Sequence, residues 1–70
     1  MESTQFIIYE FKDSIATITF NRPESLNSLH PILMEETMAA LELAEKDDGI
    51  SVIVLTGAGK AFCSGGDIQY

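Results

Sequence analysis

The sequence predicts a mixed α/β fold made of a β-hairpin, an amphipathic helix and a further, buried strand. Two short runs rich in β-branched and aromatic residues come first, at residues 6–11 and 15–20. Apolar residues then recur with helical spacing from residue 31, and residues 51–56 form a continuous apolar run. The order strand, strand, helix, strand is typical of mixed α/β proteins.

The hairpin is predicted from residue types and from their alternation. Residues 12–14, Lys-Asp-Ser, separate the two runs and favour a turn. In the second run Ala16, Ile18 and Phe20 share one face, because successive side chains of a strand point to opposite sides. We expect this face to lie in the core.

A helix is expected to begin at Pro31 and to run to about Asp47 or Asp48. Proline suits the first turn of a helix because its missing N–H is not needed there. Gly49 is expected to end the helix. The positions that recur at helical spacing, and so define a core-facing stripe, are Leu33, Thr37, Ala40, Leu41 and Ala44.

Two kinds of side chain flank this stripe. Met34 and Met38 lie beside it and are interpreted as core filler, since methionine adapts to irregular gaps. Glu35 and Glu36 are adjacent, so on a helix they point in different directions and do not form a carboxylate pair. We expect both glutamates to be solvated.

The last apolar run, Ser-Val-Ile-Val-Leu-Thr at residues 51–56, lacks the alternation of the hairpin. A continuous apolar run predicts a strand that is covered on both faces, as the strands of parallel sheets usually are. We therefore expect a buried strand here.

Length and charge narrow the class of protein. The 70 residues suffice for one small domain at most, and the 46% hydrophobic content is globular. Eleven acidic against four basic residues give a net charge of −7, which disfavours nucleic acid and anionic lipid as partners. No apolar run reaches the roughly 18 residues that a membrane span needs. The first residues lack the basic start of a secretory signal, so a cytoplasmic setting is expected.

The sequence gives little support for a metal site, a disulfide or a nucleotide-binding loop. Cys63 is the only cysteine and is interpreted as a small buried side chain, with a reactive thiol as the alternative. His30 is the only histidine, and we expect a structural role for it at the surface or at the helix start. Gly57, Gly59 and Lys60 do not complete a Walker or a dinucleotide pattern, because valine and phenylalanine stand where further glycines are required.

Two segments carry a family resemblance. Residues 61–68 read Ala-Phe-Cys-Ser-Gly-Gly-Asp-Ile and residues 21–29 read Asn-Arg-Pro-Glu-Ser-Leu-Asn-Ser-Leu. Together they resemble the enoyl-CoA hydratase/isomerase, or crotonase, superfamily, and the similarity extends over nearly all of the chain. The resemblance implies that residues 1–70 are an N-terminal fragment of a crotonase-like domain, the incomplete opening part of its ββα spiral fold.

The resemblance also implies site residues. Gly66 matches the position whose backbone N–H binds the thioester carbonyl in an oxyanion hole, and Ser64 lies beside it. Asp67 and Ile68 fall where the first residues of the next helix meet acyl-CoA, although Asp67 is equally explicable as a helix cap. The backbone of Ser25 and Leu26 matches a loop that lies along CoA. From spacing alone, Gly57, Gly59, Gly65 and Gly66 are better interpreted as turn residues that leave a strand, and it is the resemblance that favours a binding role.

The implied substrate is an acyl-CoA thioester, so coenzyme A is part of the substrate and no separate cofactor is expected. Arg22 and Lys60 would compensate the charge of the CoA phosphates or serve as structural, exposed cations. A second oxyanion donor and the acid/base glutamates are expected after Tyr70, and a homo-oligomer, trimer or hexamer, is expected at full length. Two alternatives stay open: an enzyme of the naphthoyl-CoA synthase type, and a truncated, non-catalytic fragment or interaction module.

Overall fold

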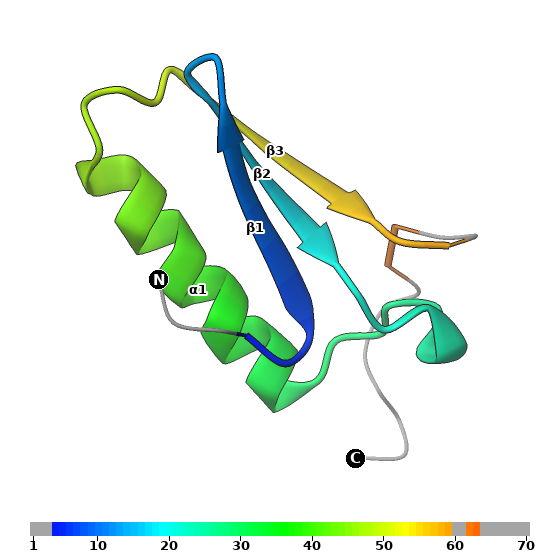
Figure 1. Cartoon of the computed structure of the whole chain (residues 1–70). Helices are drawn as coiled ribbons and strands as arrows, with labels where there is room; N and C mark the ends of the chain where they lie inside the picture. The colour runs from blue at the N-terminus through cyan, green and yellow to red at the C-terminus, as the bar shows by residue number, and fades with distance from the viewer. Residues whose placement is uncertain (1–3, 60–61, 64–70) are drawn as a thin grey trace.

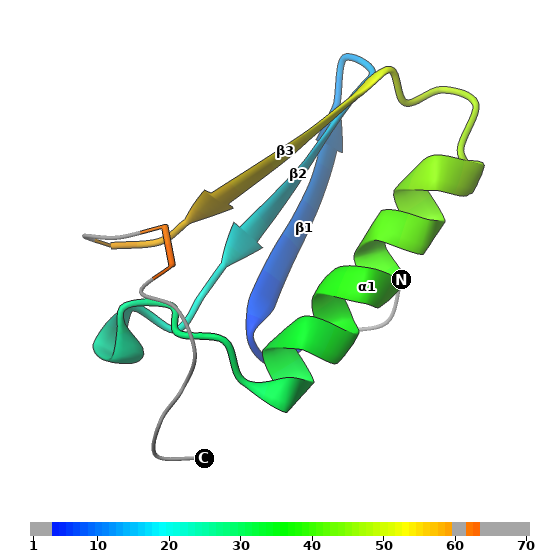
Figure 2. The same cartoon turned by 180° about the vertical axis from the view of Figure 1, so that it is seen from behind.

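The computed structural model describes residues 4–59 and 62–63. A three-stranded sheet forms one layer, and a single long helix packs against one of its faces (Figures 1 and 2). The elements in chain order are β1 (Ile7–Lys12), β2 (Ile15–Phe20), the 3₁₀ turn η1 (Pro23–Ser25), α1 (Pro31–Lys46) and β3 (Val52–Gly57). The predicted mixed α/β order of strand, strand, helix and strand is confirmed.

β2 is the central strand of the sheet. It pairs antiparallel with β1 and parallel with β3, so Ile18 lies opposite Tyr9 on one side and Leu55 on the other. A parallel pair needs a crossover connection, which α1 provides here. The carboxyl ends of β2 and β3 therefore meet at the same edge of the sheet (Figure 1).

The hairpin turn is shorter than the sequence suggests. Asp13 and Ser14 both have positive φ, 53° and 66°, as a two-residue type I′ turn requires. Lys12 pairs with Ile15 and so belongs to β1. The assignment of Lys12 to the turn is wrong because the tight turn needs only two residues with left-handed backbone.

The core lies between β1, β2 and α1. Ala16, Ile18 and Phe20 are buried on one face of β2, as predicted. The side chains that complete the buried apolar set are Ile7, Leu33, Ala40 and Ala44. Because alanines occupy the middle and the end of the buried helix stripe, the helix backbone can approach the sheet closely.

The two helix methionines are not core filler. Met34 and Met38 are 50% and 58% exposed, so that interpretation is wrong. They lie beside the buried stripe and are only partly covered by the residues around them. With Phe20, Leu29 and Thr37 they line a shallow apolar pocket of about 130 Å³.

β3 forms as a parallel strand, but its burial differs from the prediction. The four apolar residues Val52, Ile53, Val54 and Leu55 are between 39% and 50% exposed. The expectation that both faces are covered is wrong for the described residues, because α1 packs against β1 and β2 and leaves the edge strand β3 uncovered (Figure 2).

The ends of α1 are set by His30 and Asp47. The His30 Nδ1 accepts a hydrogen bond from the Ile32 N–H at 3.1 Å, and its ring meets the Phe6 ring edge-on at 5.3 Å. This confirms a structural role for His30 at the helix start, just before Pro31. At the other end, Asp47 leaves the helical backbone with φ −92° and ψ 109°. The helix thus stops before Gly49, and the assignment of Gly49 as its terminator is wrong.

Glu36 has partners that the sequence did not indicate. Its carboxylate accepts hydrogen bonds from the backbone N–H groups of Gln5, at 2.5 Å, and Phe6, at 2.7 Å. These donors precede β1, so Glu36 ties the start of the sheet to α1. The expectation that it is solvated is wrong, whereas the neighbouring Glu35 is exposed as expected.

Removing this tie is expected to lower stability. Glu36→Ala should reduce the free energy of unfolding by about 1–2 kcal/mol, because hydrogen bonds to a charged acceptor are lost. Glu36→Gln keeps one acceptor oxygen and should lose less. Urea unfolding followed by far-UV circular dichroism measures the difference, with Glu35→Ala as the matched exposed control. Equal stability of Glu36→Ala and Glu35→Ala would show that the tie contributes nothing.

Candidate functional site

The candidate site is the edge of the sheet at which β2 and β3 end. Binding sites in sheets with parallel strands commonly lie outside the carboxyl ends of those strands. Residues 21–30 follow β2 and residues 58–63 follow β3, so both segments start at this edge. We call residues 21–30, together with the described residues 58–59 and 62–63, the loop junction.

The first loop of the junction is internally hydrogen-bonded. After the η1 turn, Leu26 and Asn27 adopt left-handed backbone with φ 52° and 56°. The N–H groups of Ser25 and Leu26 donate to the carbonyls of Arg22 and Pro23 at 3.0 and 3.1 Å. A ligand placed against Ser25 and Leu26 would therefore meet carbonyl oxygens and side chains, since both N–H groups already donate within the loop.

Asn27 connects the two loops. Its side chain is fully buried, at 0% exposure, and its Oδ1 accepts from the Arg22 N–H at 2.7 Å. Its Nδ2 donates to the Ala58 carbonyl at 2.8 Å, across the junction. Sequence reasoning assigned no role to Asn27. The signal available was an asparagine within a loop, since its amide both donates and accepts and it tolerates left-handed backbone.

Arg22 is held within the protein. Its guanidinium lies over the Phe6 ring, with the central carbon 4.9 Å from the ring centre. It donates to the Ser28 carbonyl at 3.2 Å and, more weakly, to the Ser25 hydroxyl at 3.4 Å. Of the two roles considered for Arg22, these contacts favour the structural one, although the side chain is half-buried and not exposed.

Gly59 marks a close approach of the two loops. Its φ is +83°, and a Cβ added there would lie 2.9 Å from the Pro23 Cβ. The N–H of the preceding Ala58 donates to the Phe20 carbonyl at 2.8 Å, which continues the pairing just past β3. Only glycine fits this position without a shift of the backbone.

Two described residues complete the junction. The Phe62 ring stacks on the Phe20 ring at 5.1 Å, with 17° between the planes. Cys63 is half-buried and packs against the edge of the core. The interpretation of Cys63 as a small buried side chain is therefore confirmed only in part.

Of the residues predicted to contact the substrate, the structure describes only Ser25 and Leu26. Ser25 and Leu26 lie on the loop that Asn27 and Arg22 hold, and Leu26 is 46% exposed. The others lie outside the described residues: Lys60, Ser64, Gly65, Gly66, Asp67 and Ile68. Within residues 4–59 and 62–63, no three His, Cys, Asp or Glu side chains are grouped to hold a metal ion. In the same residues, no helix has the length and apolarity that a membrane crossing requires.

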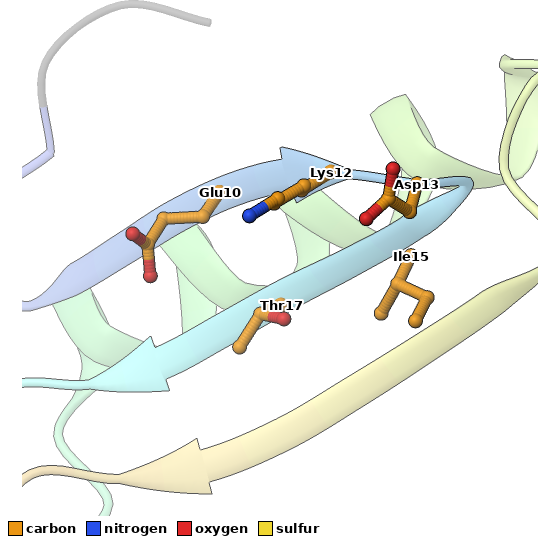
Figure 3. A pocket seen from close by; sticks show the side chains of 5 residues that line it. All are labelled: Glu10, Lys12, Asp13, Ile15 and Thr17. Carbon is orange, nitrogen blue, oxygen red and sulfur yellow. The ribbon is translucent and has the colours of Figure 1, made fainter.

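Another hollow lies elsewhere on the described part of the chain. It has a volume of about 340 Å³ and lies on the face of β1 and β2 opposite α1, at the hairpin end (Figure 3). Its lining residues are Glu10, Lys12, Asp13, Ile15 and Thr17. Ile15 begins β2 whereas the loop junction follows the end of β2, so this hollow is separate from the candidate site.

Comparison with known proteins gives a consistent result. A sequence profile described as enoyl-CoA hydratase/isomerase matches residues 10–70. An enoyl-CoA hydratase/isomerase structure from Mycobacterium paratuberculosis superposes with a TM-score of 0.92 at 48% identity, over 96% of this chain and 25% of that chain. One from Xanthobacter autotrophicus Py2 gives a TM-score of 0.92 at 40% identity, over 96% and 25%. The enoyl-CoA hydratase of Mycobacterium tuberculosis H37Rv gives 0.88 at 40% identity, over 93% and 29%. This chain spans about a quarter of the length of the proteins it matches.

Proposed function

Because the chain belongs to the enoyl-CoA hydratase/isomerase family, we propose that it forms the acyl-CoA-binding part of an enoyl-CoA hydratase or isomerase. The reaction would proceed through an enolate that a backbone oxyanion hole stabilises. The observation that carries this proposal is the loop junction, where the loop with Ser25 and Leu26 is held against the segment that continues toward Gly66. The matched profile spans both segments.

Each site residue has a proposed role. Ser25 and Leu26 lie along CoA and contact it through carbonyl oxygens and side chains. The Gly66 N–H donates to the thioester oxygen, and Ser64, Asp67 and Ile68 contact the substrate beside it. A donor aimed at the oxygen on which charge develops lowers the barrier to proton transfer at the neighbouring carbon. The carboxylate that moves this proton must lie within hydrogen-bond reach of it, and we propose that it lies outside residues 1–70.

Membership of this family also suggests a substrate class, a cellular location and an oligomeric state. The substrate is an acyl-CoA thioester of fatty acid metabolism, with CoA as part of the substrate and no separate cofactor. The full-length protein would be a cytoplasmic homo-oligomer, either a trimer or a hexamer. Its oligomeric state can be measured by analytical ultracentrifugation.

A binding experiment tests the proposal. The full-length protein is titrated with butyryl-CoA, a saturated thioester that cannot react, and binding is followed by calorimetry. Leu26→Glu should weaken binding about 3- to 10-fold, because the new carboxylate lies near the CoA phosphates. Leu43→Glu is the matched control, since Leu43 is 41% exposed on α1 and lies away from the loop junction.

Two results would contradict the proposed function. The first is failure of the wild-type protein to bind butyryl-CoA. The second is an equal effect of Leu26→Glu and Leu43→Glu, which would mean that added charge weakens binding wherever it is placed. Loss confined to Leu26→Glu would support contact between this loop and CoA.

A further inference from the structure

One buried side chain, that of Asn27, joins the two loops that follow β2 and β3. At 0% exposure it accepts from the Arg22 N–H of its own loop at 2.7 Å and donates to the Ala58 carbonyl of the other loop at 2.8 Å. A buried amide that loses a partner leaves an unsatisfied polar group, which is costly. The two loops are therefore fixed relative to each other while both bonds are made.

A second contact acts at the same place. Gly59 approaches Pro23 so closely that an added Cβ would stand 2.9 Å from the proline ring. Ala58, between Gly59 and the end of β3, is itself fixed by the bond from its N–H to the Phe20 carbonyl. The start of the second loop is thus set against the first by a hydrogen bond and by steric contact.

We propose that Asn27 is a positioning residue for the reaction: it sets the place of the CoA-contacting loop relative to the segment that leads to the oxyanion donor. This inference rests on the proposed function. Ser25 and Leu26 immediately precede Asn27, and Gly66 follows Ala58 along the second segment. A shift between the two loops would move the thioester, which is covalently joined to CoA, away from the Gly66 N–H.

The expected effect is on kcat more than on binding. A misplacement of about 1 Å can lower a rate about 10²-fold, because the reacting groups lose their alignment. The contacts of CoA with one loop would survive such a shift. A residue that only stabilises the fold would instead leave the kcat of the folded protein unchanged.

Asn27→Asp is the informative variant. Its carboxylate keeps the acceptor for the Arg22 N–H, but it places an oxygen where the Nδ2 donor faced the Ala58 carbonyl. The variant removes the bond between the loops and sets a buried negative charge against the Ala58 carbonyl, whereas the bond within the first loop is kept. We expect kcat for a short enoyl-CoA to fall about 10- to 100-fold, with butyryl-CoA affinity changed less than about 3-fold.

Gly59→Ala disturbs the same junction through its second contact, the one between Gly59 and Pro23. It should also lower kcat, and its effect should be less than additive with that of Asn27→Asp, because both act on one junction. Ala40→Gly is the control for stability: Ala40 is fully buried in the middle of α1, away from the loops. It should lower the unfolding midpoint and leave the kcat of the folded protein within about 2-fold.

The outcomes separate this inference from the proposed function. If the wild-type protein neither binds butyryl-CoA nor turns over an enoyl-CoA, both are overturned. If the wild-type protein is active and folded Asn27→Asp retains its kcat within about 2-fold, only the positioning role is overturned. If Asn27→Asp does not fold, Gly59→Ala decides: a lowered kcat with retained binding supports the role, and an unchanged kcat overturns it.

Discussion

Replacing Gly66 with proline in the full-length protein is expected to lower kcat for a short enoyl-CoA by about 10²–10³, the usual effect of losing one oxyanion-hole donor. Proline has no backbone N–H, so the proposed donor to the thioester oxygen is removed. Gly66→Ala keeps the N–H and should cost much less where the local backbone angles tolerate a Cβ. Steady-state kinetics of both variants measures the difference.

This comparison separates hydrogen-bond donation from steric effects. Both variants must first be shown to be folded and to bind butyryl-CoA as the wild-type protein does. Similar kcat values for the two folded variants would contradict the oxyanion role. Gly66 would then be a turn residue at which any small side chain serves.

Truncation of Ile18 is expected to have the largest effect on stability. Ile18 is fully buried in the central strand β2, on the face that meets α1. Ile18→Ala should lower the free energy of unfolding by about 2–5 kcal/mol, because apolar burial is lost and a cavity is left. Ile18→Val removes only one methylene and should cost about 0.5–1.5 kcal/mol.

Val54→Ala is the control for this experiment. Val54 is 40% exposed on β3, so its truncation leaves no closed cavity. Unfolding by urea, followed by circular dichroism, should therefore place Val54→Ala close to the wild-type protein. Equal destabilisation by Ile18→Ala and Val54→Ala would contradict a core centred on β2.

The features predicted correctly from the sequence depend on residues that are close together along the chain. The alternation of Ala16, Ile18 and Phe20 identifies the buried face of β2, because the period of a strand spans only a few residues. Pro31 locates the start of α1 because proline lacks an N–H, which a first turn does not need. The resemblance likewise rests on two short segments, and the matched profile confirms the family.

Predictions of burial were less accurate for side chains whose burial depends on a second element packed opposite them. The helical period places Met34 and Met38 beside the buried stripe, but the width of the contact is decided by the sheet opposite. The apolar run of β3 indicates a strand correctly, and its exposure depends on α1 lying over β1 and β2. Neither outcome can be read from periodicity, because periodicity describes one element and burial involves two.

The sequence by itself therefore determined the order of the elements, the face of β2 that is buried and the family. Only the tertiary structure decided which polar side chains hold the site together. Asn27 meets Ala58 across 31 residues of sequence, and Glu36 meets Phe6 across 30. The physical reason is that a hydrogen bond needs its two atoms about 3 Å apart. Residues this distant along the chain reach that separation only when β1, β2, β3 and α1 have packed.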